Sequence, residues 1–298
     1  MLAAPDGVSK KTPYSALAQG ILHTDVVVAV SPTYAREITT VELGSDLVPV
    51  LTALGDRLAG ILNGIDTEEF DPASDRHLPA RFDAERLDKR AENKRALQER
   101  AGLPVDDSVP LVGVVSRLVK QKGPELAAGA IRRLASGRPV QLAVLGTGEQ
   151  RYEQQLRELA RRYPQNVAVE IGFDVALAQL IYGGCDVFLM PSRYEPCGLG
   201  QMIAMRYGAV PVVRRTGGLA DSVEPYAAPD RGTGFLFDDA TVDAAAQALS
   251  EAFDVFTDRE AWQALQRRGM AKDWSWERAA GQYAELYERA LRVHAGRQ

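Results

Sequence analysis

From about Pro110 onward, short apolar runs rich in β-branched residues alternate with longer amphipathic stretches. The short runs have the length and composition of buried strands, and the longer stretches repeat their apolar residues at helical spacing. The predicted strands are Val109–Ser116, Val140–Gly146, Val167–Gly172, Cys185–Met190 and Val210–Arg214. The predicted helices between them are Pro124–Ala135, Gln150–Arg162, Val175–Tyr182 and Gln201–Tyr207. Such alternation requires crossover connections, so we expect an α/β fold with a Rossmann-like parallel sheet and helices on both faces.

The two ends of the chain follow other patterns. We expect a strand over Val26–Val30, and because no earlier strand precedes it, the first sixty residues should be mobile or pair with another chain. Residues 84–101 are highly charged and predict a solvated helix rather than a binding patch. The remaining predicted helices are Tyr14–Leu22, Pro32–Ile38 with Ser31 as its N-cap, Val242–Phe256, Ala261–Met270 and Trp276–Val293.

The composition is that of an ordinary globular protein. Of 298 residues, 46% are apolar and 25% charged, and the formal net charge of −5 gives no reason to expect nucleic acid or an anionic membrane as a partner. No apolar run approaches the roughly 20 residues that span a bilayer, and residues 1–14 lack the apolar centre of a signal peptide. Two cysteines do not indicate a disulfide scaffold. We therefore expect a cytoplasmic protein.

A turn in the second half of the chain combines groups that suit a sugar nucleotide. Ser192–Gln201 follows the predicted strand Cys185–Met190, contains Glu195 and two glycines, and leads into a predicted helix. Free backbone N–H groups and the helix dipole at such a junction attract an anion such as phosphate. A carboxylate instead suits hydroxyl groups or a centre that becomes positive. Phosphate and polyol side by side indicate a sugar nucleotide as the ligand.

Two cations follow the first predicted strand of the sheet. Arg117 and Lys122 lie between that strand and the helix that begins at Pro124. An arginine fork and a lysine point charge can neutralise a diphosphate there and support its departure as a leaving group. No Asp-x-Asp triplet occurs, so we expect no metal and no cofactor, with the two cations in place of Mg²⁺. Solvated surface cations are the alternative interpretation.

Two further strand ends carry glycines. Gly146-Thr147-Gly148 lacks the third glycine of a dinucleotide fingerprint, because Arg151 occupies that place, and this counts against a redox NAD site. Phe173 ends the next strand. It can either stack on a nucleotide base or cap the sheet as a core aromatic.

Several motifs, in their order along the chain, resemble those of bacterial glycogen synthase and plant starch synthase, glycosyltransferase family 5. The resemblance runs from about Tyr14 to the C-terminus. Its motifs are Ser31–Ile38, Leu62–Asp66, Val115–Leu118, Gln121–Gly123, Pro191–Leu199 and Arg214–Asp221. It implies a GT-B fold, in which two Rossmann-like domains face each other across a cleft. It also implies metal-free transfer of glucose from ADP-glucose to the 4-hydroxyl at the non-reducing end of an α-1,4-glucan, with retention of configuration.

The resemblance assigns roles to single residues. Arg117 and Lys122 would hold the diphosphate and Glu195 would face the donor glucose, as the catalytic residues. The other ADP-glucose contacts would come from an aromatic ring against adenine and from backbone groups along the sugar and phosphate. These residues are Phe173, Cys197, Gly198, Leu199 and Gly200. The family often has Tyr at the place of Phe173 and Thr or Tyr at the place of Gly200, so a side-chain contact from position 200 to phosphate is not expected.

The resemblance also divides the chain. Residues 1–62 would be a remnant of the N-terminal, acceptor-side domain, 63–275 the nucleotide-sugar-binding Rossmann-like domain, and 276–298 a C-terminal helix. The family's Lys-x-Gly-Gly-Leu loop, and its histidine whose backbone carbonyl lies near the reacting sugar, have no counterpart in the sequence. We expect the donor-binding half of a synthase, with strongly lowered activity alone because positioning and charge stabilisation are shared between the domains. A separate chain could supply the other domain.

Two other functions stay open. The chain could be a nucleotide-sugar-binding module or regulatory half-subunit without turnover. It could also be another GT-B enzyme, such as an epimerase or a phosphorylase, although no lysine is singled out for the pyridoxal phosphate that a phosphorylase needs.

Overall fold

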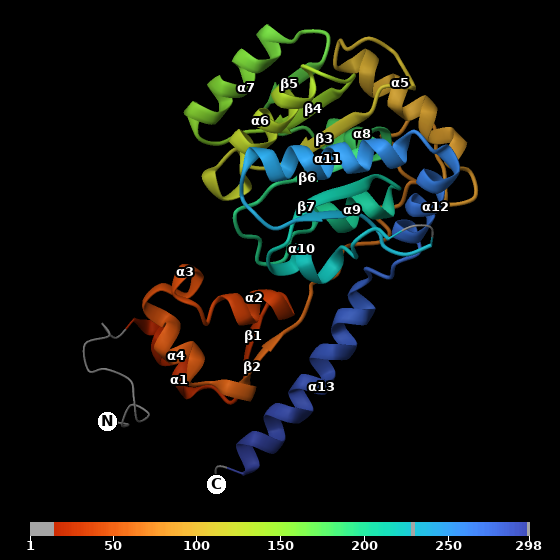
Figure 1. Ribbon diagram of the computed structural model, residues 1–298. Helices are drawn as coiled ribbons and strands as arrows, with labels where there is room; N and C mark the ends of the chain where they lie inside the picture. Colours follow the sequence, from red (N-terminus) through yellow and green to blue (C-terminus); the bar gives the residue numbers. More distant parts are fainter. Residues whose placement is uncertain (1–14, 228–229, 297–298) are drawn as a thin grey trace.

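The computed structural model describes residues 15–227 and 230–296, which form a large α/β domain and a small N-terminal module (Figure 1). The segment that lacks a signal-peptide pattern, residues 1–14, lies outside the described residues. Within the described ranges, no helix combines the length and apolar character needed to cross a bilayer.

A six-stranded parallel sheet forms the centre of the large domain. Its spatial order is β5-β4-β3-β6-β7-β8, the order of a doubly wound Rossmann fold. The strands are β3 (Leu111–Val115), β4 (Gln141–Gly146), β5 (Val167–Ile171), β6 (Val187–Met190), β7 (Val210–Arg214) and β8 (Phe235–Phe237). The predicted Rossmann-like parallel sheet is confirmed, whereas the three residues of β8 were too few to give a periodic pattern.

Helices cover both faces of this sheet (Figure 1). One layer contains α6 (Pro124–Leu134), α7 (Gln150–Arg162), α11 (Val242–Phe256) and α12 (Arg259–Met270). The other contains α5 (Arg90–Arg100), α8 (Val175–Gly184), α9 (Gly200–Arg206) and α10 (Gly217–Ser222).

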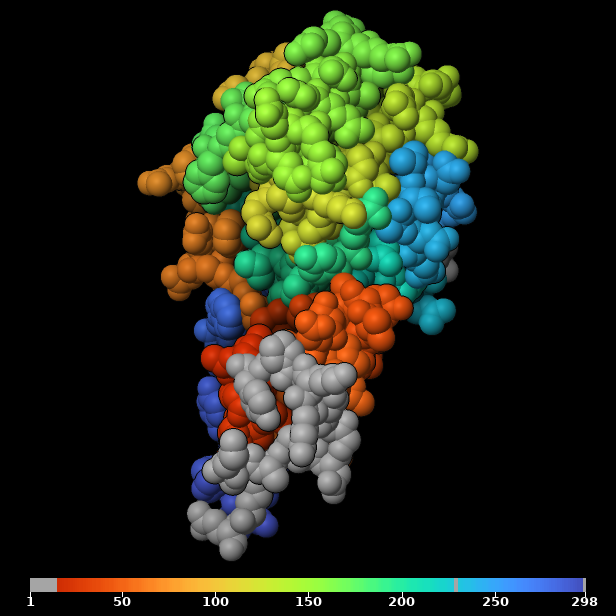
Figure 2. Space-filling model, turned by 90° about the vertical axis from the view of Figure 1, so that its left-hand side faces the viewer, coloured from red at the N-terminus to blue at the C-terminus, as the bar shows by residue number. Residues whose placement is uncertain are grey.

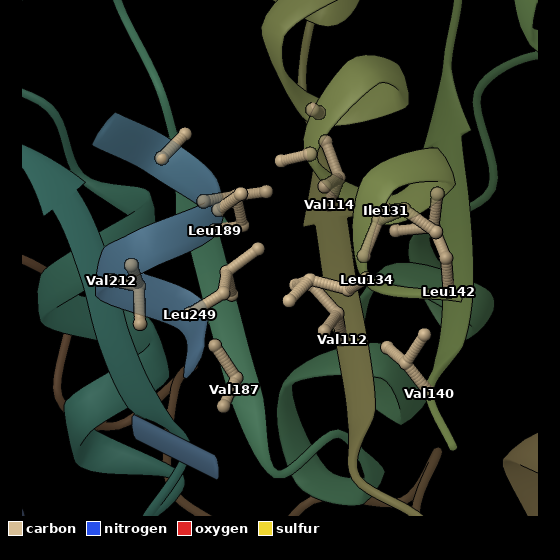
Figure 3. Packing of buried hydrophobic residues seen from close by; sticks show 14 of the residues in the cluster. Val112, Val114, Ile131, Leu134, Val140, Leu142, Val187, Leu189, Val212 and Leu249 are labelled. Atoms are coloured by element: carbon tan, nitrogen blue, oxygen red, sulfur yellow. The ribbon is translucent and has the colours of Figure 1, made fainter. Parts of the chain in front are cut away.

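Alternate side chains of each central strand belong to opposite cores. Val112 and Val114 of β3 pack toward α6 and α11, where Ile131 and Leu249 meet them (Figure 3). Leu111 of the same strand packs into the core beneath α5, α8 and α9. Both faces of the sheet are therefore dry, as the continuous apolar runs predicted.

The N-terminal module overturns one expectation. Its strand β1 (Val27–Ala29) pairs in parallel with β2 (Leu58–Gly60), so the strand predicted over Val26–Val30 does have a partner. That partner was missed because it is only three residues long and stands apart from the other apolar runs. The reason for expecting mobility or pairing with another chain is thereby removed. The helices of the module are α1 (Ala16–His23), α2 (Pro32–Glu37), α3 (Val41–Gly44) and α4 (Val48–Thr52).

The C-terminal helix α13 (Trp276–Ala295) leaves the large domain and runs along the small sheet (Figures 1 and 2). Its Ala279 and Leu286 form a buried cluster with Ile61, which follows β2. One helix thus covers a sheet formed by segments more than two hundred residues earlier in the chain. The predicted division of the chain at residues 62 and 275 stays a prediction.

Helix α5 differs from the solvated helix expected over residues 84–101. It begins at Arg90 and buries one face. Arg90 donates hydrogen bonds from Nε to the Tyr207 carbonyl (2.9 Å) and from Nη2 to the Cys185 carbonyl (2.6 Å). Lys94 forms a buried ion pair with Asp186 at 2.8 Å. The expectation of a solvated helix was wrong for this face. The charged groups of Arg90 and Lys94 bind these partners, while their aliphatic stems pack against the core.

Candidate active site

The chain changes direction across the sheet between β3 and β6. From β3 it continues outward to β4 and β5, and from β6 it continues to β7 and β8 on the other side. The loops that follow two such strands diverge and leave a crevice at their carboxyl ends, where open α/β sheets bind ligands. Arg117 and Lys122 lie after β3, and Glu195 lies after β6.

A direct contact between Lys122 and Glu195 joins these two loops. Lys122 Nζ lies 2.5 Å from Glu195 Oε2, and the Ser192 hydroxyl donates to the same oxygen at 2.9 Å. The side chains of Lys122 and Glu195 are only 17% and 6% exposed. Glu195 Oε1 has no hydrogen-bond partner among residues 15–227 and 230–296, so this atom is available to a ligand hydroxyl.

Backbone contacts hold the two loops in register. The Gln121 carbonyl accepts a hydrogen bond from the Arg193 amide at 2.7 Å, and the Gln121 side chain donates to the Tyr194 carbonyl at 3.2 Å. The Glu195 carbonyl in turn accepts from the Gly218 amide at 3.0 Å. The loops after β3, β6 and β7 therefore form one connected wall behind the carboxylate.

A cavity of about 400 Å³ opens beside this crevice. Arg117 and Phe173 both line it, together with apolar side chains of β3, β4 and α8. The Arg117 guanidinium is exposed and donates to the Gln121 side chain at 3.4 Å. Phe173 is 90% exposed, so the alternative of a core aromatic that caps the sheet is wrong. A cation and an exposed aromatic ring at one cavity suit a nucleotide.

The turn after Glu195 is compact and closely packed. Gly198 has a φ of +73°, a conformation that favours glycine, and Gly200 begins α9. Cys197 is buried and free, whereas Leu199 is 45% exposed. Burial raises the pKa of the Cys197 thiol, against a smaller opposing effect of the Asn63 amide that donates to it. A protonated, enclosed thiol is a packing group rather than a nucleophile.

The N-terminal module contacts this same turn. The Ser31 hydroxyl donates to the Pro196 carbonyl at 2.6 Å, and Asp221 accepts from both the amide and the hydroxyl of Thr33 at 2.7 and 2.6 Å. Glu37 accepts from the Gly217 amide at 3.0 Å. Helix α2 is thus docked on the loops that carry the candidate site.

Of the two predicted cations, the structure brings Lys122 into contact with Glu195. Arg117 belongs to the same loop as Lys122. The interpretation of Lys122 as a solvated surface cation is wrong, whereas Arg117 is exposed. Single-residue reasoning missed Ser192 and Thr33 as partners of the site, although both lie inside the motifs that carry the resemblance. The roles of all these residues in binding stay predictions.

Two family models match the chain. The model described as glycosyl transferases group 1 matches residues 96–267, and the starch synthase catalytic domain matches residues 2–53. The chain is 47% identical to the glycogen synthase of Kosmotoga olearia over 283 residues, which are 95% of this chain and 59% of that protein. It is 51% identical to the glycogen synthase of Anaeromyxobacter dehalogenans, over 92% of this chain and 57% of that protein. The chain thus spans less than two thirds of the length of these relatives.

Solved structures agree with the family and the fold. The catalytic domain of starch synthase IV from Arabidopsis thaliana, bound to ADP and acarbose, superimposes with a TM-score of 0.85 at 39% identity, over 92% of this chain and 57% of that one. The sucrose-phosphate synthase of Thermosynechococcus elongatus, at 21% identity and a TM-score of 0.62, shares the fold. Together with the doubly wound sheet, these matches confirm the GT-B glycosyltransferase fold class. The chain belongs to the group 1 glycosyl transferases and is a homologue of the glycogen and starch synthases.

Proposed function

We propose that this chain carries the ADP-glucose-binding half of a glycogen or starch synthase. The observation that carries the proposal is the Lys122–Glu195 contact at the switch point of the sheet, beside a cavity lined by Arg117 and Phe173. This observation supports the proposal because a cation suits phosphate, a carboxylate suits a sugar hydroxyl, and an exposed aromatic ring at the neighbouring cavity suits a base. The starch synthase IV structure that the chain resembles holds ADP, which supports this choice of nucleotide.

The donor would lie along the carboxyl edge of the sheet. Its base would enter the cavity at Phe173, its diphosphate would meet Arg117 and Lys122, and its glucose would lie against Glu195. Backbone groups of Cys197, Gly198 and Leu199 would line the sugar, and the Gly200 amide would face the distal phosphate. Phosphate would compete with Glu195 for the Lys122 ammonium, which can donate three hydrogen bonds.

The parent reaction is a front-face displacement with retention of configuration. The bond between the anomeric carbon and the phosphate oxygen breaks, and ADP leaves with the bonding electrons. The 4-hydroxyl of the α-1,4-glucan forms the new bond on the same face, and its proton passes to the departing phosphate oxygen. Arg117 and Lys122 stabilise the negative charge that grows on ADP, so the step needs neither a metal nor a cofactor.

Transfer to a glucan also requires groups that bind the acceptor. Positioning of the glucan needs an acceptor-side domain, which a separate chain could supply. We expect turnover by this chain alone to be strongly reduced. Neither nucleic acid nor a membrane is an expected partner, and we assign the reaction to the cytoplasm.

Labelled glucose distinguishes the enzyme from its alternative. The chain is incubated with ADP-glucose labelled in the glucose and with glycogen, and incorporation is compared with that of a Glu195→Gln variant. Incorporation that disappears in the variant supports the transferase. Because turnover by this chain alone should be reduced but measurable, saturable ADP-glucose binding with no incorporation above a protein-free blank supports a nucleotide-sugar-binding module without turnover. The absence of both binding and incorporation would contradict both functions.

A further inference from the structure

The cavity beside Arg117 is also lined by two polar side chains of α8. These are Gln179 and Tyr182, which lie three residues apart, on the same face of the helix. Both are well buried, with 5% and 6% of their surface exposed. They come from a part of the chain in which the sequence showed only a predicted helix.

The side-chain polar atoms of Gln179 and Tyr182 lack hydrogen-bond partners within the described residues. Gln179 Oε1 is enclosed and has no hydrogen bond, and within residues 15–227 and 230–296 neither Gln179 Nε2 nor the Tyr182 hydroxyl forms one. Buried polar groups in native proteins are almost always paired. The enclosed Gln179 oxygen without a partner, beside an accessible Tyr182 hydroxyl at the same cavity, indicates that a ligand completes these hydrogen bonds.

The rest of the cavity limits what that ligand can be. Val115, Leu145 and Ile203 give it apolar walls, Phe173 lies exposed at it, and Arg117 supplies a cation. A flat apolar ring with a polar edge, attached to an anion, fits all of these features. A nucleobase of a nucleoside diphosphate has this form.

We propose that Gln179, together with Tyr182, recognises the amino edge of an adenine base and so selects the nucleotide. This inference rests on the proposed function, which assigns the cavity to the donor. A glutamine amide pairs with the adjacent donor N6 and acceptor N7 of adenine, whereas guanine presents two acceptors, O6 and N7, at the same edge. The terminal amide torsion is soft, so the amide can turn toward the base. The Tyr182 hydroxyl can donate to or accept from a further ring position.

A double-mutant cycle between protein and ligand tests this assignment. Binding of ADP and of purine riboside 5′-diphosphate, which lacks the 6-amino group, is measured by calorimetry for the unmodified chain and for Gln179→Leu. We expect the unmodified chain to bind ADP about tenfold more tightly than the analogue. We expect Gln179→Leu to lose about tenfold in ADP affinity and to bind the two ligands equally.

Two controls separate recognition from folding. Gln154→Leu makes the same chemical change on the exposed face of α7 and should leave both affinities unchanged. Gln179→Leu should not lower the thermal midpoint of the ligand-free protein, because the amide has no hydrogen bond to lose. If leucine disturbs the packing, Gln179→Met repeats the cycle with a side chain of similar length.

The outcomes distinguish this inference from the proposed function. ADP binding with the same preference over the analogue in both proteins contradicts the role of Gln179 and leaves the donor site in place. Tighter binding of UDP than of ADP contradicts the selection of adenine. No binding of either nucleotide to the unmodified chain contradicts the proposed function and this inference with it.

Discussion

At Glu195, a single carboxylate oxygen accepts hydrogen bonds from both Lys122 and Ser192, while the other oxygen has no partner within the described ranges. The ion pair balances a charge that would otherwise be costly to bury. The arrangement fixes the carboxylate before any ligand arrives and keeps one acceptor atom for it. This geometry suits a ligand hydroxyl, as the proposed donor site requires.

Removal of the Lys122 ammonium should destabilise the fold, because the Glu195 carboxylate is buried beside it. We expect Lys122→Ala to lower the free energy of unfolding by about 3 kcal/mol, because Glu195 then stays buried without a partner charge. The double variant Lys122→Ala/Glu195→Gln should recover most of this loss. Urea denaturation measures both values, and a single variant within about 0.5 kcal/mol of the parent would show that the pair is effectively solvated.

The buried thiol of Cys185 should make stability depend on alkaline pH. Burial raises its pKa to about 12, whereas the same thiol titrates near 9.0 when it is exposed. The native state therefore keeps its proton between these values while the unfolded state loses it. The protonated Cys185 thiol therefore makes its full contribution to the free energy of unfolding below pH 9. Above pH 9 this contribution falls by about 1.4 kcal/mol per pH unit, until the native thiol also ionises.

Urea denaturation at pH 8 and pH 10 measures this contribution. The loss of stability between the two pH values should be about 1.4 kcal/mol smaller in Cys185→Ala than in the parent protein. Equal losses in the two proteins would mean that Cys185 ionises as readily in the folded state as in the unfolded one.

At the scale of elements, the site depends on how closely the loops after β3 and β6 approach each other. Gly123 ends the β3 loop with a φ of +65°, and a Cβ there would lie 2.3 Å from the Pro191 carbonyl oxygen at the end of β6. Only glycine combines this backbone conformation with so short an approach. The residue between Lys122 and α6 thus sets the distance between the two loops.

A pair of glycines separates these two effects. Gly102 has a similar φ of +67° but has no atom within 4 Å of the position a Cβ would take. We expect Gly102→Ala to cost about 1 kcal/mol of unfolding free energy from backbone strain alone, and Gly123→Ala to cost about 3 kcal/mol and to weaken ADP-glucose binding. Chemical denaturation and calorimetry check both variants. Equal costs would mean that the β3 and β6 loops can move apart freely.

The hydrophobic pattern predicted the bounds best for strands that are buried on both sides and for helices that are amphipathic over three turns. Helix α7 has the predicted bounds, and β7 does as well. The failures have physical reasons. Strands β2 and β8 have three residues each, too few for any period, and α5 places charged heads against partners that only the folded chain brings near.

At the scale of the whole molecule, the small module is held from two sides. Helix α2 contacts the loops of the candidate site through Ser31, Thr33 and Glu37. Helix α13 covers the small sheet with Ala279 and Leu286. Residues 15–60 are thereby tied to the loops of the candidate site, so their position affects the loop that carries Glu195.

The cover provided by α13 can be tested with two leucines of that helix. Leu286 is buried against the small sheet, whereas Leu291 is 71% exposed. We expect Leu286→Ala to cost about 2 kcal/mol and to speed hydrogen exchange in Val27–Ala29 and Leu58–Gly60. Leu291→Ala should change neither quantity. Unchanged exchange in both variants would show that the small sheet is stable without the helix.

The candidate site could be predicted in part because parallel strands end at one edge of a sheet. From that rule, the sequence alone predicted that Arg117, Lys122 and Glu195 lie at the same edge of the sheet. It could not predict which face of α8 borders the cavity, so Gln179 and Tyr182 were missed. It also could not predict the contact of Thr33 with Asp221, which joins segments 188 residues apart.

Calorimetric titration of the chain with ADP-glucose tests whether the donor binds between the loops after β3 and β6. The measurement uses the parent protein, Lys122→Ala, and Lys120→Ala as a matched exposed lysine on the same loop. We predict saturable binding by the parent, at least about tenfold weaker binding by Lys122→Ala, and no change in Lys120→Ala. Equal affinity in all three proteins, or no binding by the parent, would contradict a donor site between β3 and β6.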